Sequence, residues 1–269
     1  MEPAGRKISA TDQEEIDASK APLMAHLIEL RDRIKAGVLG FFPCLILGLV
    51  FYELFYDILT APLYAALEAL KLESAVKFRT VQGVMLFQIK SGIFAGFFLS
   101  TPWLLYQLWL FVAPGLYRHE RRLVIPFVVM TSAFFFAGAI FCYYLVLPFA
   151  FDFLLSYARS EGPRQLLPDI TLEDYLSFIM RILFAFALVF ETPIVLGFFT
   201  WIGLTTYNGL LRFWRWAVLL SFVVAALLTP PDYVTQILLA LPLISFYGLS
   251  VVFAWIIERR RERPEPHQG

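Results

Sequence analysis

Residues 176–202, LSFIMRILFAFALVFETPIVLGFFTWI, contain only two ionisable side chains, Arg181 near one end and Glu191 near the middle. Crossing the ~30 Å hydrocarbon core of a bilayer takes roughly 20 predominantly apolar residues in a helix. The stretch is therefore long and apolar enough to be a transmembrane helix. A carboxyl group in such a helix is costly in hydrocarbon, so Glu191 is expected to face the protein interior or water.

Five further segments have the same character, and the composition of the whole chain agrees with them. Of the 269 residues, 59% are hydrophobic and only 16% are charged, whereas about a quarter of the residues in soluble domains are charged. The apolar runs do not alternate with polar residues, which excludes the strands of a transmembrane β-barrel. The sequence therefore predicts an all-α polytopic membrane protein. The expected spans are approximately residues 36–56, 91–113, 123–150, 176–202, 213–229 and 233–257.

The connections between the spans differ in their basic residues, which sets the expected orientation. If the N-terminus is cytoplasmic, that side carries 15 Lys and Arg residues and the outer side carries 7. Because basic loops are retained in the cytoplasm, both termini are expected there. The predicted organisation is a flexible cytoplasmic tail at residues 1–21, a six-helix transmembrane domain at 22–257 and a cytoplasmic tail at 258–269.

Patterns outside and within the spans predict the shape of the domain. Apolar residues fall on one side of residues 22–35, which predicts an amphipathic helix lying along the cytoplasmic interface before the first span. The hydrophobic residues within 57–83 predict a short helix against the outer surface. Prolines inside or near the ends of spans kink helices, so we expect kinked helices in a curved arrangement with a concave face. These prolines are Pro102, Pro148, Pro193 and Pro242.

Two acids lie at the predicted cytoplasmic surface. Glu120 is surrounded by basic residues in FVAPGLYRHERR (111–122), where it either pairs with a neighbouring arginine or receives a cation from another molecule. Glu29 lies four residues before Arg33 and is either a solvated residue or a second carboxylate of the same site. Two nearby carboxylates could bind a ligand with two guanidinium groups, because the planar fork of arginine meets a carboxylate bidentately.

Polar residues of the later spans leave alternatives open. Glu191 is either a protonated acid bonded to backbone that Pro193 frees, or the polar lining of a cavity that contacts a partner helix or a proton. Gln236, near the outer end of the last span, could bond to a second helix or within its own protein. Asp232 is expected to cap the N-terminus of that span.

Several classes of function find no support in the sequence. The chain lacks a Gly-x-x-x-x-Gly-Lys phosphate loop, and its three histidines lie outside the apolar spans. Cys44 and Cys142 lie within apolar spans without a second Cys or His at ligand spacing, so no metal site is expected. The net charge of zero argues against a nucleic-acid partner. We therefore expect neither enzymatic activity nor a cofactor.

Four stretches of the chain form a recognisable set: HLIELRDRI (26–34), PWLLYQLWLFVAPGLYRHERR (102–122), YLSFIMRILFAFALVFETPIV (175–195) and LLTPPD (227–232). Together they resemble the TatC family, the multi-spanning receptor of the twin-arginine protein translocase. The resemblance extends from about residue 22 to about residue 257, with the motifs in order. It implies six kinked helices in a curved, glove-like arrangement in the bacterial cytoplasmic (inner) membrane, with both termini in the cytoplasm.

The resemblance also implies a function and roles for particular residues. The protein would bind the Ser/Thr-Arg-Arg signal peptides of folded precursors for export across the lipid bilayer. It would gather the single-span partners TatA and TatB, as a homo-oligomer within the receptor complex. Glu29 and Glu120 would receive the twin arginines, and Phe111 would belong to the same receptor surface. Glu191 would be the intramembrane acid of the concave face, and Gln236 would lie where a partner's transmembrane helix makes contact.

Two other functions are compatible with the apolar spans. A proton- or ion-coupled transporter of a small molecule would use Glu191 as its coupling acid, and would be indifferent to Glu29 and Glu120. It predicts a water-filled path past Glu191. A purely structural membrane subunit would depend on no surface acid. The two surface acids and the absence of a visible internal repeat favour the receptor.

Overall fold

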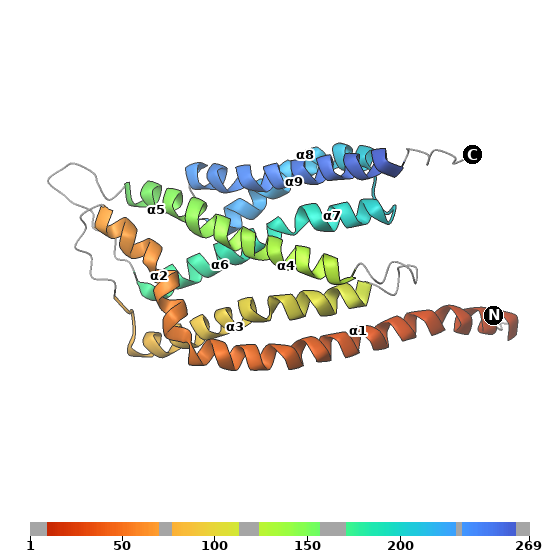
Figure 1. The fold of residues 1–269 in the computed structure, drawn as a ribbon, viewed down its shortest axis with the longest axis horizontal. Coiled ribbons are helices and arrows are strands. Elements are labelled where there is room, and N and C mark those ends of the chain that lie inside the picture. Colours follow the sequence, from red (N-terminus) through yellow and green to blue (C-terminus); the bar gives the residue numbers. More distant parts are fainter. Residues whose placement is uncertain (1–9, 70–76, 113–123, 157–170, 230–232, 262–269) are drawn as a thin grey trace, which may run out of the picture.

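The computed structural model describes residues 10–69, 77–112, 124–156, 171–229 and 233–261 (Figure 1). These residues form helices, and six of the helical segments are long and apolar enough to span a membrane. The prediction of an all-α polytopic fold is therefore confirmed. The candidate spans are His26–Val50, Val81–Val112, Val124–Phe153, Leu172–Trp201, Tyr207–Leu228 and Tyr233–Arg259.

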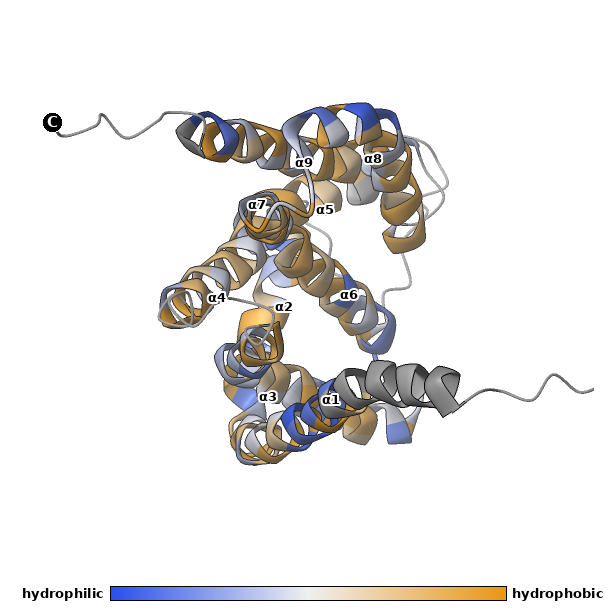
Figure 2. Cartoon of the chain, turned by 90° about the vertical axis from the view of Figure 1, so that its right-hand side faces the viewer, coloured by the Kyte–Doolittle hydropathy of each residue, from blue (hydrophilic) through white to orange (hydrophobic). Residues whose placement is uncertain are grey.

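Helix α1 begins, and helix α9 finishes, at the same end of the molecule, which is called the terminal end here (Figure 1). The opposite end is called the far end. Viewed from the terminal end, α1 and α3 lie together at one side and α8 and α9 at the other, with α4, α6 and α7 between (Figure 2). The elements are α1 (Ala10–Val50), α2 (Tyr52–Ala69), α3 (Val81–Val112), α4 (Val124–Phe141), η3 (Cys142–Val146), α5 (Leu147–Ser156), α6 (Leu172–Phe190), α7 (Thr192–Trp201), α8 (Tyr207–Leu228) and α9 (Tyr233–Arg261).

The start of the chain departs from the prediction in two ways. The amphipathic segment 22–35 is not a separate interfacial helix, because α1 runs unbroken from Ala10 to Val50. Leu, Glu, Arg and Lys dominate the junction and are all good helix formers, so no residue there ends the helix. The first span also ends earlier than expected. The chain turns at Phe51, and the residues that follow belong to α2.

Glycines let α1 and α3 approach closely along much of their length. A Cβ atom on Gly48 would lie 2.4 Å from the carbonyl oxygen of Gly92. A Cβ on Gly96 would lie 2.6 Å from the Cα atom of Leu45. Small residues serve this purpose in membrane helices, where packing of backbone against backbone replaces the hydrophobic effect. Nearer the terminal end, the indole of Trp103 covers Gly40 and donates from Nε1 to the carbonyl oxygen of Ala36 at 2.9 Å.

The largest buried cluster surrounds α6. The side chains of Ile179, Ile182 and Phe186 are fully buried there, and residues of α2, α3, α4, η3, α5, α8 and α9 contribute to the same cluster. At Gly138 of α4 a Cβ would lie 2.7 Å from the carbonyl oxygen of Phe186. Helix α6 is therefore the central element of this cluster, around which these seven elements pack.

A helix is found where the sequence predicts one after the first span, as α2 at the far end of the molecule, and two tyrosines hold it. Pro62 lies inside α2, and a helical proline leaves the carbonyl four residues earlier without its usual partner. That carbonyl, of Ile58, accepts a hydrogen bond from the Tyr143 hydroxyl at 2.7 Å. The hydroxyl of Tyr175 donates to the next carbonyl, of Leu59, at 2.6 Å. The kink in α2 is thus tied to η3 and α6.

The four prolines named from the sequence fall at helix irregularities or inside helices, as predicted. Pro102 and Pro242 lie inside α3 and α9. Pro193 follows the break between α6 and α7, where Glu191 is the residue between the two helices. Pro148 follows a π-helical turn in which the Leu147 N–H donates to the carbonyl of Cys142. These breaks give the curved arrangement of kinked helices that the sequence predicts.

Candidate functional site

Glu29 lies near the terminal end of the first span and has a cation beside it. Its Oε1 atom is 3.4 Å from Nη2 of Arg33, one helical turn further along α1. The exposed fraction of the side chain is 29% for Glu29 and 34% for Arg33. A pair at this spacing contributes only about 0.3–0.5 kcal/mol to a helix. The carboxylate is therefore positioned but only weakly engaged, and a better cation could displace Arg33.

An aromatic contact connects this turn of α1 to the end of α3. The rings of His26 and Phe111 stack with their centroids 4.4 Å apart and their planes 23° from parallel. His26 precedes Glu29 by three residues, which places both on neighbouring positions of the helix surface. The structure thus packs the helical turn that carries Glu29 against Phe111 through His26. The sequence assigned Glu29 and Phe111 to one surface on resemblance alone.

His26 is the member of this group that sequence reasoning missed. The sequence treats it only as one of three histidines outside the apolar spans. The signal that could have identified it is its i, i+3 spacing from Glu29 at the start of the motif HLIELR. Its ring stacks on that of Phe111 and so joins α1 to the end of α3.

Glu120 lies within residues 113–123, outside the described residues, but the helix ends on both sides of that segment are well defined. A cluster of aromatic residues joins the end of α3 to the start of α4. The ring centroid of Trp109 lies 4.9 Å from that of Phe127 and 4.8 Å from that of Phe198 of α7, and the Trp109 indole donates to the Thr131 hydroxyl at 3.2 Å. The segment carrying Glu120 therefore begins directly after Val112, one residue beyond Phe111.

Glu191 is buried at the break between α6 and α7, with 8% of its surface exposed. Its backbone carbonyl accepts from the N–H groups of Ile194 and Val195. Its Oε1 atom is buried and has no hydrogen-bond partner among the described residues. The alternative in which the acid bonds to backbone freed by Pro193 finds no support at this oxygen. The acid is placed in the protein interior, as expected from its cost in hydrocarbon.

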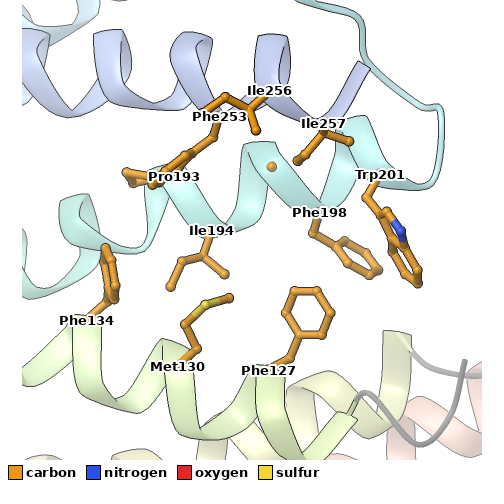
Figure 3. Close-up of a pocket in the computed structure, with 11 residues that line it drawn as sticks. Phe127, Met130, Phe134, Pro193, Ile194, Phe198, Trp201, Phe253, Ile256 and Ile257 are labelled. Atoms are coloured by element: carbon orange, nitrogen blue, oxygen red, sulfur yellow. The ribbon is translucent and has the colours of Figure 1, made fainter. Parts of the chain in front are cut away.

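An apolar hollow of about 400 Å³ opens beside this break, between α4, α7 and α9 (Figure 3). The part of its wall that α7 contributes begins at Pro193, two residues after Glu191, and ends at Trp201 near the terminal end. None of the residues that line it is ionisable, so it does not form a hydrophilic path past Glu191. The lining residues are Phe127, Met130, Phe134, Pro193, Ile194, Gly197, Phe198, Trp201, Phe253, Ile256 and Ile257.

Gln236 is engaged within its own protein. Its side-chain amide donates from Nε2 to the carbonyl oxygen of Phe222 at 3.2 Å, joining α9 to α8. The sequence left open whether Gln236 bonds to a second helix of a partner or within its own protein. For the amide N–H, this bond favours the second alternative. Asp232, the expected cap of this helix, lies outside the described residues.

The site residues described here have the chemistry of a surface that exchanges one cation for another. Within the described ranges no group of three or more His, Cys, Asp or Glu side chains could hold a metal ion. Glu191 is the acid in the interior that could take part in catalysis, but its buried Oε1 atom has no hydrogen-bond partner among the described residues. The arrangement is suited to binding.

Comparison with known proteins agrees with the motifs. The family model described as Sec-independent protein translocase protein (TatC) matches residues 25–242. The chain is a member of the TatC family. A TatC protein of Magnetococcus marinus is 39% identical over 246 residues, covering 91% of this chain and 88% of the relative. A TatC protein of Escherichia coli K12 is 38% identical, covering 91% of this chain and 92% of the relative.

The TatC fold itself is shared with a solved structure. The crystal structure described as the twin arginine translocase receptor TatC matches with a TM-score of 0.76 at 32% sequence identity. The match covers 87% of this chain and all of the solved one. The six-helix architecture described above is therefore that of the TatC family.

Proposed function

We propose that this TatC protein is the receptor subunit of a twin-arginine translocation system. It binds the Ser/Thr-Arg-Arg signal peptides of folded precursors at the terminal end of the molecule, and it recruits single-span TatA and TatB subunits for their export. Membership of the TatC family and the likeness to a solved twin-arginine translocase receptor support this proposal.

The observation that carries the proposed site is the stacking of His26 on Phe111 at 4.4 Å. It fixes the first turn after His26, and with it Glu29, beside the end of α3. The segment that contains Glu120 leaves α3 at that point. In the proposal, Glu120 supplies a second carboxylate beside that of Glu29, and each can be bound bidentately by one of two adjacent guanidinium groups.

The partial exposure of Glu29 suits selective binding. A fully exposed acid–base contact contributes only about 0.2–1 kcal/mol, which is too little to select a signal. Breaking a buried pair costs about 3–5 kcal/mol, but burying it also makes it slow to exchange. At 29% exposure, Glu29 lies between these limits. Twin lysine, which offers point charges in place of planar forks, is expected to bind less tightly.

The proposed location is the bacterial inner membrane with both termini in the cytoplasm. Basic residues support this orientation, since the sequence assigns 15 Lys and Arg to the side of the N-terminus and 7 to the other. Glu29, Phe111 and Glu120 would then face the compartment in which precursors are synthesised. The homo-oligomeric assembly and the partner contact near Gln236 belong to the same proposal.

A proton- or ion-coupled transporter is the alternative, and the buried, unpartnered Oε1 atom of Glu191 is the observation that favours it. Such a mechanism needs a hydrophilic path to the acid. The hollow beside Glu191 is lined only by residues without ionisable groups, and it would not conduct a polar solute. The receptor is the better supported function.

The proposal is tested by the binding of a fluorescent Ser-Arg-Arg-x-Phe-Leu-Lys peptide to the detergent-purified protein. Twin-lysine peptide is compared, and Glu29→Ala and Glu120→Ala are measured beside Glu68→Ala. Glu68 is an exposed acid of α2 at the far end, so it controls for the loss of one negative charge.

The receptor predicts that twin lysine and each of the two site variants weaken binding about ten-fold or more, while Glu68→Ala leaves it unchanged. Equal binding of both peptides to all four proteins would contradict the receptor site. A loss that is the same for all three variants would show that the peptide responds to overall charge alone.

A further inference from the structure

One face of α8 changes from basic to apolar along its length. Arg212, Arg215, Leu219 and Val223 follow the spacing i, i+3, i+7 and i+11, which places them on one side of a helix. All four are exposed. The two arginines lie toward the terminal end and the aliphatic side chains toward the far end, since α8 begins at Tyr207 and ends at Leu228.

The two arginines line a hollow of about 630 Å³ together with Leu211 and Trp214. One wall of the hollow is held in place, because the ring of Trp214 packs 5.7 Å from that of Tyr247 on α9. Within the described part of the chain, neither arginine forms an ion pair with an acid. Two guanidinium groups therefore line the same hollow, and no acid of the described residues is paired with them.

The length of α8 places these arginines at the depth of lipid headgroups. The 13 residues from Trp216 to Leu228 rise about 20 Å at 1.5 Å per residue, which is less than the ~30 Å of a hydrocarbon core. Both guanidinium groups are consequently at or below the level of the nearest phosphates. A cation at that depth is stabilised by pairing with an anion.

We propose that Arg212 and Arg215 bind the phosphate of an anionic phospholipid, whose acyl chains lie against Leu219 and Val223. Charge complementarity selects this occupant. The hollow is cationic where a phosphate would lie, and the same face is aliphatic where the chains would follow. A twin-arginine peptide is excluded because it carries the same charge as the site. The α1–α3 surface with Glu29 lies on the opposite side of the molecule (Figure 2), so the lipid site is independent of the proposed receptor site.

The test is native mass spectrometry of the full-length protein in detergent, titrated with phosphatidylglycerol or with phosphatidylcholine of the same chains. The double variant Arg212→Gln/Arg215→Gln is compared with Arg31→Gln/Arg259→Gln, which removes the same charge from the same end. Arg212→Lys/Arg215→Lys retains the charge and controls for folding. Inorganic phosphate is added as a competitor in a separate titration.

Each arginine near the membrane surface is expected to contribute about a five-fold gain in affinity for an anionic lipid. The double Gln variant should therefore bind phosphatidylglycerol about 25-fold more weakly, the double Lys variant should bind at an intermediate level, and the Arg31/Arg259 variant should change little. Equal affinity for the two lipids would overturn the proposal. So would an equal loss in both double Gln variants, or displacement of the lipid by millimolar phosphate.

Discussion

The helix pair α1–α3 and the central helix α6 bury their surfaces in different ways. Helix α1 meets α3 along glycine positions such as Gly48 and Gly96, while its other sides remain exposed; Leu39 is 75% exposed. Helix α6 is enclosed by its neighbours, and Ile179 and Phe186 are fully buried. One region is held by a single line of close backbone contacts, and the other by packing on every side.

The glutamate in each region reflects this difference. Glu29 on α1 has a cation 3.4 Å away and remains partly exposed, so its partner can be exchanged. Glu191 at the end of α6 is buried, and its Oε1 atom has no partner in the described residues. An acid that recognises a ligand from outside needs to be partly exposed and to have an exchangeable partner, as Glu29 is and has. This difference supports the proposal that the α1–α3 pair carries recognition and that the interior acid has a separate role.

The largest effect is expected from Gly96→Ala. A Cβ atom there would lie 2.6 Å from the Cα atom of Leu45 and 3.0 Å from its backbone nitrogen. Backbone atoms cannot rotate away, so α1 must shift, at a cost of about 1–3 kcal/mol as for other overpacked sites. Thermal unfolding in detergent should show this loss, and twin-arginine peptide should bind more weakly because Glu29 moves with α1.

Gly37→Ala is the matched control for this substitution. Its Cβ would meet only a methyl group of Leu104 at 3.5 Å, an ordinary contact. Stability and peptide binding should be retained. If Gly96→Ala were tolerated as well as Gly37→Ala, the close α1–α3 contact would not be what holds α1 in place.

Tyr175→Phe should destabilise the central region without affecting recognition. The substitution removes a buried hydrogen bond to the Leu59 carbonyl, which is 2.6 Å long, and such a bond contributes about 0.5–1.5 kcal/mol to stability. Tyr144→Phe is the control, because Tyr144 is 74% exposed. The midpoint of thermal unfolding should fall for Tyr175→Phe alone. A selective loss of peptide binding at full stability would contradict the separation of the two regions.

The smallest effect is expected from Arg33→Gln. Arg33 competes with an incoming arginine for Glu29, and its pair at i, i+4 contributes about 0.3–0.5 kcal/mol. Removing it should strengthen twin-arginine peptide binding about two-fold, measured by fluorescence anisotropy. Arg31→Gln, whose partner is Asp32 at 3.0 Å, should have less effect. Weaker binding by Arg33→Gln would mean that Arg33 supports the site instead of competing for it.

Much of the fold could be predicted from the sequence because membrane spans are specified locally. Hydrophobic length gave the six spans, and prolines gave the irregularities, including the break after Glu191. The unbroken length of α1 was missed although the residues at its junction are good helix formers. Another feature depended on packing that no local pattern reports. The capture of the Ile58 and Leu59 carbonyls depends on tyrosines 85 and 116 residues away in the chain.

Less of the candidate site than of the fold could be predicted from the sequence. Glu29 and Phe111 were assigned to one surface through family resemblance, and only the structure supplies the contact of His26, one turn before Glu29, with Phe111. His26 was missed because an exposed histidine on a helix has no distinguishing pattern by itself. Gln236 could not be assigned from sequence, since its bond to Phe222 joins two helices whose relative rotation the sequence does not specify. The role of Glu120 stays a prediction.

The most direct test of the account is a double-mutant cycle between Glu29→Gln and replacement of each signal arginine by lysine. Such a cycle isolates the pairwise term from general effects on folding or charge. The account predicts a coupling of at least about 1 kcal/mol for Glu29 with one of the two arginines, and none when Glu191→Gln is used in its place. Zero coupling for Glu29, or equal coupling for Glu191, would contradict the claim that the α1–α3 end recognises the twin arginines.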